Sequence, residues 1–375
     1  MATIPLSITK QFAVLKDPRI LRRRRHNLLD IVVLGICGVI AGCDTWEQIE
    51  LFGNNHHDWF KRFLRLPNGI PSHDTIERVF DRLQPLAFQR CFTNWTQAVC
   101  RLGLKQVAFD GKTVRGSGNA KGLAALHLVS AWATEQQLIL GQVAVDCKSN
   151  EITAIPKLLE LLDIKGAFVS IDAMGCQKEI AKKIVAQGGH YVLTVKDNQP
   201  HLLEDIQQSF CDAMDKDFAG MEYDTYEKRE RGHGREEYRS YTVLHWTEGL
   251  RNAADWEQIS TIGICYSTRT IAGVSSEEIR YFIGCKKASA KVYGKALRNH
   301  WSIENNLHWQ LDVSFGEDSN RTQKRNAAEN FAMLRRIALN LLKRHPSKRS
   351  IDSKRLLAGW NADFLDEVLN PDDIG

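Results

Sequence analysis

Two aspartates each follow a short apolar run and precede small residues. Asp110 follows Val-Ala-Phe and precedes Gly-Lys, and Asp172 follows Phe-Val-Ser-Ile and precedes Ala-Met-Gly. An Asp-Gly pair is often only turn chemistry, but strand ends are also rigid mounts for functional groups. Because Mg²⁺ prefers carboxylate oxygens and water, two such acids at one sheet edge would suit it. Asp110 and Asp172 are therefore candidate metal ligands.

Paired acids of this kind suit the cleavage of phosphodiester bonds. Two divalent ions about 4 Å apart can activate the attacking oxygen and stabilise the leaving oxygen. Such a site needs several Asp or Glu residues that converge from different elements. A third acid must therefore come from elsewhere in the chain.

The segment 300–312 offers that acid. On a helix, steps of four residues place His300, Glu304, His308 and Asp312 along one polar stripe. Histidines spaced four apart can share a metal, so the stripe could form a nitrogen-rich zinc or iron site. Alternatively, Glu304 is the one metal ligand while its His, Asn and Trp neighbours contact DNA, or the stripe is merely the solvated edge of a half-buried helix. Spacing alone leaves these interpretations open.

The residues from 106 onward predict the sheet that would position the two aspartates. Short turns separate three strand-like runs, which indicates an antiparallel meander; the runs cover residues 106–110, 125–132 and 139–145. Helix and strand then alternate at 154–163, 167–172, 178–187 and 191–196. Such alternation implies right-handed parallel crossovers. This is the element order of the α/β ribonuclease-H-like fold, in which the first and fourth strands are neighbours in a mixed sheet.

The flanking sequence predicts further parts. Short helices are expected at 27–40, 45–52, 56–64 and 72–82, within an α-helical N-terminal domain over 1–103 that binds DNA. The catalytic core would cover 104–345, with a β-rich insertion at about 210–287, and 346–375 would form a C-terminal tail. A basic amphipathic helix is expected at 326–343.

Composition is that of a globular protein, with 43% hydrophobic and 25% charged residues. The net charge of +5 does not by itself indicate a polyanionic partner. Positive charge is concentrated, however, in 19–25, with five Arg, and in 321–355, with eleven Lys or Arg against two acids. Such blocks could contact phosphates or form solvated helix faces.

The nine cysteines are scattered and include no CxxC pair, which indicates reduced thiols in a cytosolic protein. The N-terminus lacks the features of a signal peptide. The strongest apolar run, 31–42, is shorter than the roughly 20 residues needed to cross a bilayer and predicts a buried helix. We expect a cytoplasmic, nucleoid-associated protein without a membrane partner.

Four segments resemble one group of bacterial transposases. They are FDGKTVRGS (109–117), SIDAMGCQK (170–178), YVLTVKDNQP (191–200) and RNHWSIENNLHWQLDV (298–313). In this order they resemble the H-repeat-associated (ISAs-type) transposases of insertion sequences, which belong to the DDE transposase superfamily. The resemblance covers nearly the whole chain.

The resemblance implies a DDE triad of Asp110, Asp172 and Glu304 that binds Mg²⁺, with Mn²⁺ as a substitute. The implied enzyme cleaves DNA at the ends of an insertion sequence and transfers the new 3′-hydroxyl to target DNA. Its partners would be double-stranded DNA, as terminal inverted repeats and as target, and a second copy of the chain in the DNA complex. Asp110 and Asp172 are thus supported by position and by resemblance, whereas Glu304 depends mainly on the resemblance.

Related transposases carry the pattern Tyr-x2-Arg-x3-Glu-x6-Lys around the third acid. Leu297, His300 and Leu311 stand at those places here, so the DNA-handling role of that motif does not carry over directly. Arg298, His300 and Trp301 are candidate DNA contacts instead.

Three cations beside the predicted sheet edge are candidate phosphate contacts, although surface pairing with nearby acids is an equal alternative. They are Lys112, Arg115 and Lys196.

Three rival functions remain open. A nuclease on the same fold would cut DNA without joining it. A catalytically silent relative would only bind DNA. A histidine-rich metalloenzyme would use His300, Glu304 and His308.

Overall fold

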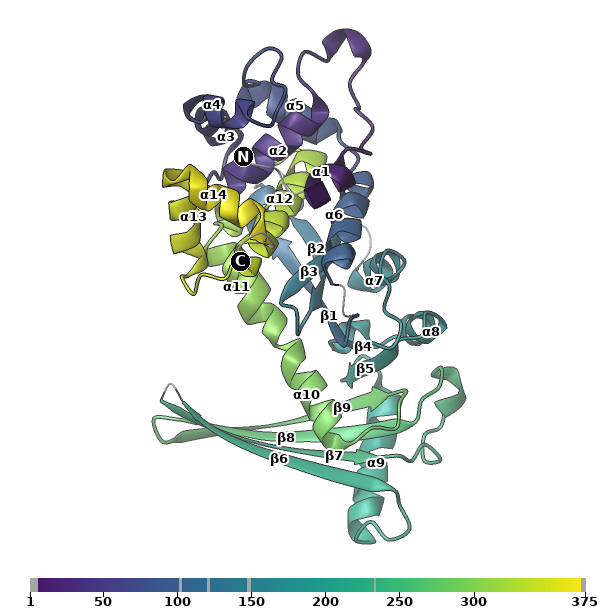
Figure 1. The fold of residues 1–375 in the computed structure, drawn as a ribbon. Coiled ribbons are helices and arrows are strands. Elements are labelled where there is room, and N and C mark those ends of the chain that lie inside the picture. The colour runs from purple at the N-terminus through teal and green to yellow at the C-terminus, as the bar shows by residue number, and fades with distance from the viewer. Residues whose placement is uncertain (1–5, 101–102, 120–121, 147–149, 233, 372–375) are drawn as a thin grey trace.

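The computed structural model describes residues 6–100, 103–119, 122–146, 150–232 and 234–371. Within them, nine strands form one mixed sheet in the order β3-β2-β1-β4-β5-β9-β8-β7-β6. Helices from both ends of the chain gather above the first strands, and the last four strands extend away below (Figure 1).

The first five strands form the predicted core sheet. They are β1 (Gln106–Val114), β2 (Leu126–Ala133), β3 (Leu138–Ala144), β4 (Phe168–Ile171) and β5 (His190–Val195). The first three form an antiparallel meander, and β4 is parallel to both β1 and β5. This confirms the ribonuclease-H-like order, with the first and fourth strands as neighbours.

One detail of the prediction is wrong: β1 does not end at Asp110. Its pairing with β2 continues from Asp110↔Ser130 to Val114↔Leu126. The Asp-Gly pair therefore lies inside a strand, because β2 supplies backbone partners for residues beyond it. Only the parallel pairing with β4 stops before Asp110, at Phe109↔Ile171.

Helices cover one face of this sheet with a shared apolar core. They are α7 (Glu151–Leu159), α8 (Lys178–Ala186) and α9 (Pro200–Asp215). Their buried side chains, such as Leu158 and Ile184, pack with Val107 and Phe109 of β1. The helix expected to begin at residue 154 begins earlier, at Glu151.

The predicted β-rich insertion is confirmed and continues the core sheet. It contains β6 (Tyr223–Gly232), β7 (Arg235–Leu244), β8 (Thr261–Ile271) and β9 (Val274–Gly284). All four are antiparallel to their neighbours, and β9 pairs with β5 from Val192↔Gly284 to Val195↔Tyr281. We call these four strands the blade.

A helical connection leads from the blade back to the core. It consists of α10 (Ala290–His300), a π-helical turn (Glu304–His308) and α11 (Trp309–Val313). In Figure 1, α10 lies against the blade at one end and reaches the core sheet at the other.

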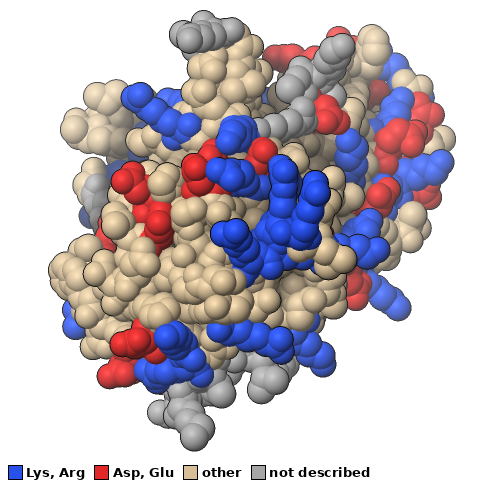
Figure 2. Space-filling view, turned by 90° about the horizontal axis from the view of Figure 1, so that it is seen from above, with Lys and Arg blue, Asp and Glu red and all other residues tan. Residues whose placement is uncertain are grey.

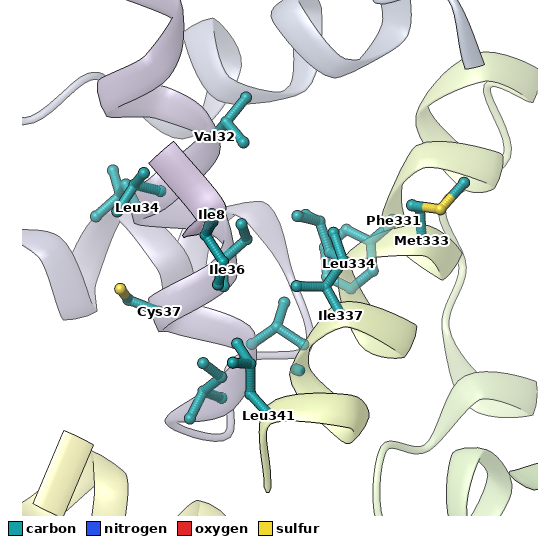
Figure 3. Close-up of a cluster of buried hydrophobic side chains, with 14 of the residues drawn as sticks. Ile8, Val32, Leu34, Ile36, Cys37, Phe331, Met333, Leu334, Ile337 and Leu341 are labelled. Carbon is teal, nitrogen blue, oxygen red and sulfur yellow. The ribbon is translucent and has the colours of Figure 1, made fainter. Parts of the chain in front are cut away.

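The N-terminal helices share a core with the C-terminal ones. The helices are α1 (Leu6–Phe12), α2 (Leu28–Ile40), α3 (Trp46–Asn55), α4 (His57–Lys61), α5 (His73–Arg82), α6 (Pro85–Val99), α12 (Arg325–Arg344), α13 (Ile351–Trp360) and α14 (Ala362–Leu369). Figure 3 shows Ile36 of α2 facing Leu334 and Ile337 of α12. The apolar run 31–42 is the buried helix that was predicted.

Two arginines of helix α12 contradict the interpretation of the 321–355 block as phosphate contacts or a solvated helix face. Arg335 and Arg336 are only 1% and 0% exposed. The reason is that α2, α5, α6 and β3 pack around α12, so these two arginines lie in the interior, whereas Lys343 and Arg344 at its end are partly exposed. Arg336 Nη1 lies 2.8 Å from Oε1 of Glu317, whose side chain is also fully buried.

The arginines of the 19–25 block differ in exposure. Arg19 is buried and pairs with Asp17, whereas Arg22, Arg23 and Arg25 are exposed. Figure 2, seen from above the N-terminal helices, shows Lys and Arg gathered in the middle of that face.

The eight cysteines in the described part of the chain are free thiols, as predicted, and Cys147 lies outside the described residues. None of the described helices combines the length and apolar character needed to cross a membrane.

Candidate active site

Asp110 and Asp172 lie side by side where β1 and β4 stop pairing. The last parallel pair, Phe109↔Ile171, immediately precedes both acids. Asp110 Oδ1 accepts a hydrogen bond of 2.9 Å from the backbone N–H of Gly111, and Asp172 Oδ1 accepts one of 3.2 Å from Met174. The backbone therefore fixes both carboxylates at one place on the sheet.

Negative charges crowd this place. Burial raises the pKa of Asp110 to about 7, and the nearby charges of Asp172, Glu151 and Glu304 act in the same direction, against the Gly111 hydrogen bond. Burial and Glu151 likewise raise the pKa of Asp172, although backbone N–H groups and Lys196 oppose them. A divalent cation would relieve this repulsion, because its positive charge would offset the negative charges of the neighbouring carboxylates.

This donor set fits hard divalent ions such as Mg²⁺, whose preferred ligands are oxygens. Among the residues that the structure describes, no three His, Cys, Asp or Glu side chains are close enough together to hold a metal ion as they stand. The carboxylates nevertheless affect one another's ionisation from three different elements, β1, β4 and the π-helical turn. Asp110, Asp172 and Glu304 are therefore the residues that would hold such an ion.

A hydrogen-bond network docks the helix before Glu304 onto the catalytic strands. Gln106 Nε2 of β1 donates to Ser170 Oγ at 3.1 Å and to the carbonyl of Ala296 at 2.6 Å. Asn299 Nδ2 donates to Gln106 Oε1 at 3.2 Å, and His300 Nδ1 lies 3.2 Å from Ser170 Oγ. These contacts set where α10 ends and therefore where Glu304, four residues after His300, enters the site.

The π-helical turn breaks the polar stripe expected from four-residue steps. Glu304 is exposed at its start, whereas His308 Nδ1 lies 3.5 Å from Asp110 Oδ2. Burial lowers the pKa of His300 to about 4 and that of His308 to about 3, so both rings are neutral near pH 7. In the described structure, His300 bonds to Ser170 and His308 adjoins Asp110, so the histidines do not form the nitrogen-rich metal site. Turns of this kind are frequent at functional sites.

Glu151 is a fourth carboxylate that the sequence interpretation missed. His127 Nε2 donates a 2.7 Å hydrogen bond to Glu151 Oε1, and its Nδ1 lies 2.8 Å from the hydroxyl of Thr113. A Cβ at Gly111 would lie 2.0 Å from Glu151 Oε1, so only glycine leaves room for this carboxylate beside Asp110. The sequence did carry one signal for Glu151, since it is an acid directly after Asn150, at the start of a helix. The signal was missed because the helix was expected to begin three residues later, at residue 154.

The cations predicted near the sheet edge lie in different surroundings. Lys112 is buried, with Nζ 2.6 Å from Asp312 and 3.2 Å from Asp318, so it ties β1 to the segment after Glu304. Arg115 is 84% exposed, with its Nε 3.5 Å from Asp318. Lys196 is exposed beyond β5 and lowers the pKa of Asp172. Arg115 and Lys196 are thus accessible to a ligand, whereas Lys112 is held in ion pairs.

Arg298 and Trp301, also predicted DNA contacts, lie elsewhere than these cations. Together with His300 they line a cleft of about 540 Å³ between α10 and the blade, which ends at Glu304. The Arg280 guanidinium stacks over the Trp301 ring at 4.3 Å from its centroid. The candidate contacts therefore form two groups, one beside the strand ends and one in the cleft.

Comparison with known proteins decides the family. Residues 101–341 match the family described as "Transposase DDE domain", and residues 9–96 match the one described as "DDE_Tnp_1-associated". The chain belongs to the DDE transposase family. Its core sheet and helical N-terminal part therefore lie in the segments that match transposase families.

Several Escherichia coli proteins are similar to this chain over most of its length and most of their own. "H repeat-associated putative transposase YhhI" of strain K12 is 39% identical over 370 residues, which are 96% of this chain and 97% of that protein. "Putative transposase YncI" of O157:H7 is 40% identical over 372 residues, 97% of this chain and 94% of that protein. Among solved structures, a piggyBac transposase synaptic complex with hairpin DNA aligns with 99% of this chain and 78% of its own, at a TM-score of 0.38 and 8% identity, which is too low to indicate more.

Proposed function

We propose that this chain is a transposase that cleaves DNA at the ends of an insertion sequence and joins the released 3′-hydroxyl to target DNA. The observation that supports it most is the placement of Asp110 and Asp172 side by side, with Glu304 close enough to raise the pKa of Asp110. When bound, two Mg²⁺ ions would activate the attacking oxygen and stabilise the leaving one. Asp110, Asp172 and Glu304 would hold them.

The chain's own residues contribute positioning. The Gln106–Ser170–His300 contacts hold α10 against the sheet and so orient Glu304. Lys196, close enough to Asp172 to lower its pKa, and the exposed Arg115 beyond the end of β1 would contact phosphates of the bound DNA. A nuclease that cuts DNA without joining it would need the same residues. The joining step therefore needs its own test.

The proposed function implies inverted repeats in the DNA that flanks the coding region, and the test uses them. A duplex that carries one repeat is incubated with the protein, Mg²⁺ and a target plasmid. A transposase yields a 3′-hydroxyl at the repeat end and a covalent repeat–plasmid product. Cleavage without that product would indicate a nuclease, and binding without cleavage would indicate a catalytically silent relative.

Further parts of the proposal concern DNA binding. The exposed Arg22, Arg23 and Arg25 give the N-terminal helices cations for phosphate contacts. Because two element ends must be joined in one reaction, we also propose that two copies of the chain assemble on DNA.

Glu151→Gln is expected to weaken Mg²⁺ binding about tenfold, because it removes one of the charges that the ion neutralises while keeping the shape and the contact with His127. The measurement is the Mg²⁺ concentration needed for half-maximal thermal stabilisation. Glu160→Gln is the control, since Glu160 is exposed just after α7 and pairs with Lys183. Equal Mg²⁺ requirements for both variants would contradict the placement of Glu151 in the site.

Metal binding is expected to weaken as the pH falls through about 7. Asp110 must lose its proton to bind a cation, and its pKa is raised to about 7, mainly by burial. For the metal-free protein the sign is opposite: an acid with a raised pKa destabilises the fold when ionised, so stability rises as the pH falls from 8 towards 6. Melting curves with and without Mg²⁺ at pH 6 and 8 check both trends. Equal Mg²⁺-induced shifts at the two values would contradict them.

A further inference from the structure

The cleft between α10 and the blade is unusually rich in arginine. Its lining includes five arginines, Arg235, Arg239, Arg269, Arg280 and Arg298, and three glutamates, Glu237, Glu278 and Glu304. The guanidiniums come from three blade strands and from α10. Figure 1 shows α10 lying against the blade, so the cleft leads from the outer hairpins to the active site.

Strand pairing brings the blade arginines to one face. Residues two apart on a strand point to the same side, so Arg235, Glu237 and Arg239 share a face of β7. Glu237 stands opposite Arg269 of β8 in the antiparallel register. The same face turns towards α10 and Arg298.

One carboxylate lies among four of these guanidiniums. Glu237 bonds to Arg239, and its oxygens lie 3.2 Å from Arg235 Nε, 3.8 Å from Arg298 Nη2 and 3.9 Å from Arg269 Nε. Although burial alone would raise the pKa of Glu237, Arg239, Arg235 and Arg298 lower it. A single negative charge cannot neutralise four positive ones, even with Glu230 as a second partner of Arg239.

This arrangement has the chemistry of a phosphate-binding surface. Guanidinium groups present planar sets of N–H donors that match phosphate oxygens, and they are more weakly hydrated than ammonium groups. Glu237 collects them on the cleft wall before any ligand arrives, which reduces the entropy lost on binding. Arg280 is different, because Glu278 holds it in two 2.6 Å contacts beneath Trp301.

We propose that this arginine cleft binds the sugar–phosphate backbone of DNA next to the scissile bond and guides that strand to Glu304. The proposal rests on the proposed function and adds the blade to the DNA-binding surface. A backbone fits better than a small anion, because the donors are spread along an open cleft that leads to the active site rather than gathered around one point.

Arg269→Ala tests this with a matched control on the same blade. Arg269 is half exposed and its ion pair with Glu237 is long, at 3.9 Å, so its removal should leave the fold intact. Arg231→Ala is the control: Arg231 also pairs with a glutamate, Glu236, and is 81% exposed. It stands opposite Glu236 in the register and so lies on the other face of the β6–β7 hairpin from Glu237.

Binding of a labelled random-sequence duplex is measured by fluorescence anisotropy across a range of salt concentrations, without divalent ions. Each lost phosphate contact lowers the slope of log affinity against log salt by about 0.9. We expect this decrease for Arg269→Ala, a decrease of about twice that size for Arg269→Ala with Arg298→Ala, and the wild-type slope for Arg231→Ala. Melting temperatures confirm that each variant is folded.

Wild-type slopes for the single and double variants would overturn the proposal, as would an equal decrease for Arg231→Ala. This failure is distinguishable from failure of the proposed function. If the wild type cleaves repeat DNA and joins it to the plasmid while the cleft variants bind with wild-type slopes, the transposase assignment stands and the cleft assignment falls. If the cleft variants lose affinity but the wild type cleaves nothing, the cleft assignment stands and the transposase assignment falls.

Discussion

Asp172→Asn is expected to reduce Mg²⁺-dependent DNA cleavage by about 10³-fold or more, with little change in DNA affinity. Loss of a metal ligand removes several kcal/mol of transition-state stabilisation, and about 4 kcal/mol corresponds to that factor. The measurement is the rate of 3′-end formation on a repeat-bearing duplex. Asp197→Asn, at an exposed aspartate just beyond the neighbouring β5, should cleave at the wild-type rate.

The same assay decides between Glu304 and Glu151 as the third essential acid. Glu304→Gln should lose as much activity as Asp172→Asn, whereas Glu151→Gln should retain measurable cleavage at high Mg²⁺. Cleavage at the wild-type rate by Glu304→Gln would show that the triad is wrong. A complete loss in Glu151→Gln, together with that result, would assign the third position to Glu151.

Glu317→Gln is expected to lower the free energy of unfolding by about 3–5 kcal/mol, because it leaves a buried guanidinium without its counter-charge. Glu317 and Arg336 are both fully buried, and Arg335 lies in the same interior with its pKa lowered to about 10 by burial. The measurement is the urea denaturation curve.

A surface ion pair near the same helix provides the comparison. Glu77 lies 3.2 Å from Lys324, which directly precedes α12, and both side chains are partly exposed. Glu77→Gln should change the free energy of unfolding by less than about 1 kcal/mol. Equal losses of stability in Glu317→Gln and Glu77→Gln would contradict the buried ion pair between Glu317 and Arg336.

Local patterns predicted much of the core sheet because strand residues interact mainly with adjacent strands. Alternating strand and helix runs identified β4 and β5, and chain order made β1 and β4 neighbours. The position of Asp110 within β1 was missed because it depends on β2, whose pairing beyond Asp110 no local signal showed.

Sequence patterns could not predict the buried arginines of α12 or the π-helical turn at Glu304. Arg335 and Arg336 look like a basic surface on a helical wheel, and only the N-terminal helices packed over α12 place them in the core. A regular helix predicts His300 and His308 on one stripe. Instead His300, at the end of α10, contacts Ser170, and the π-helical turn that follows places His308 beside Asp110.

The continuity of the sheet from β1 to β6 also determines how DNA can approach the acids. Neighbouring strands in a sheet rotate by roughly 20–25° relative to one another, so the four steps from β4 to β7 amount to about 80–100°. Figure 1 shows the blade strands crossing the direction of the core strands. In the proposed complex, a DNA backbone that follows the blade would therefore cross the direction of β1 and β4 where their parallel pairing stops, beside Asp110 and Asp172.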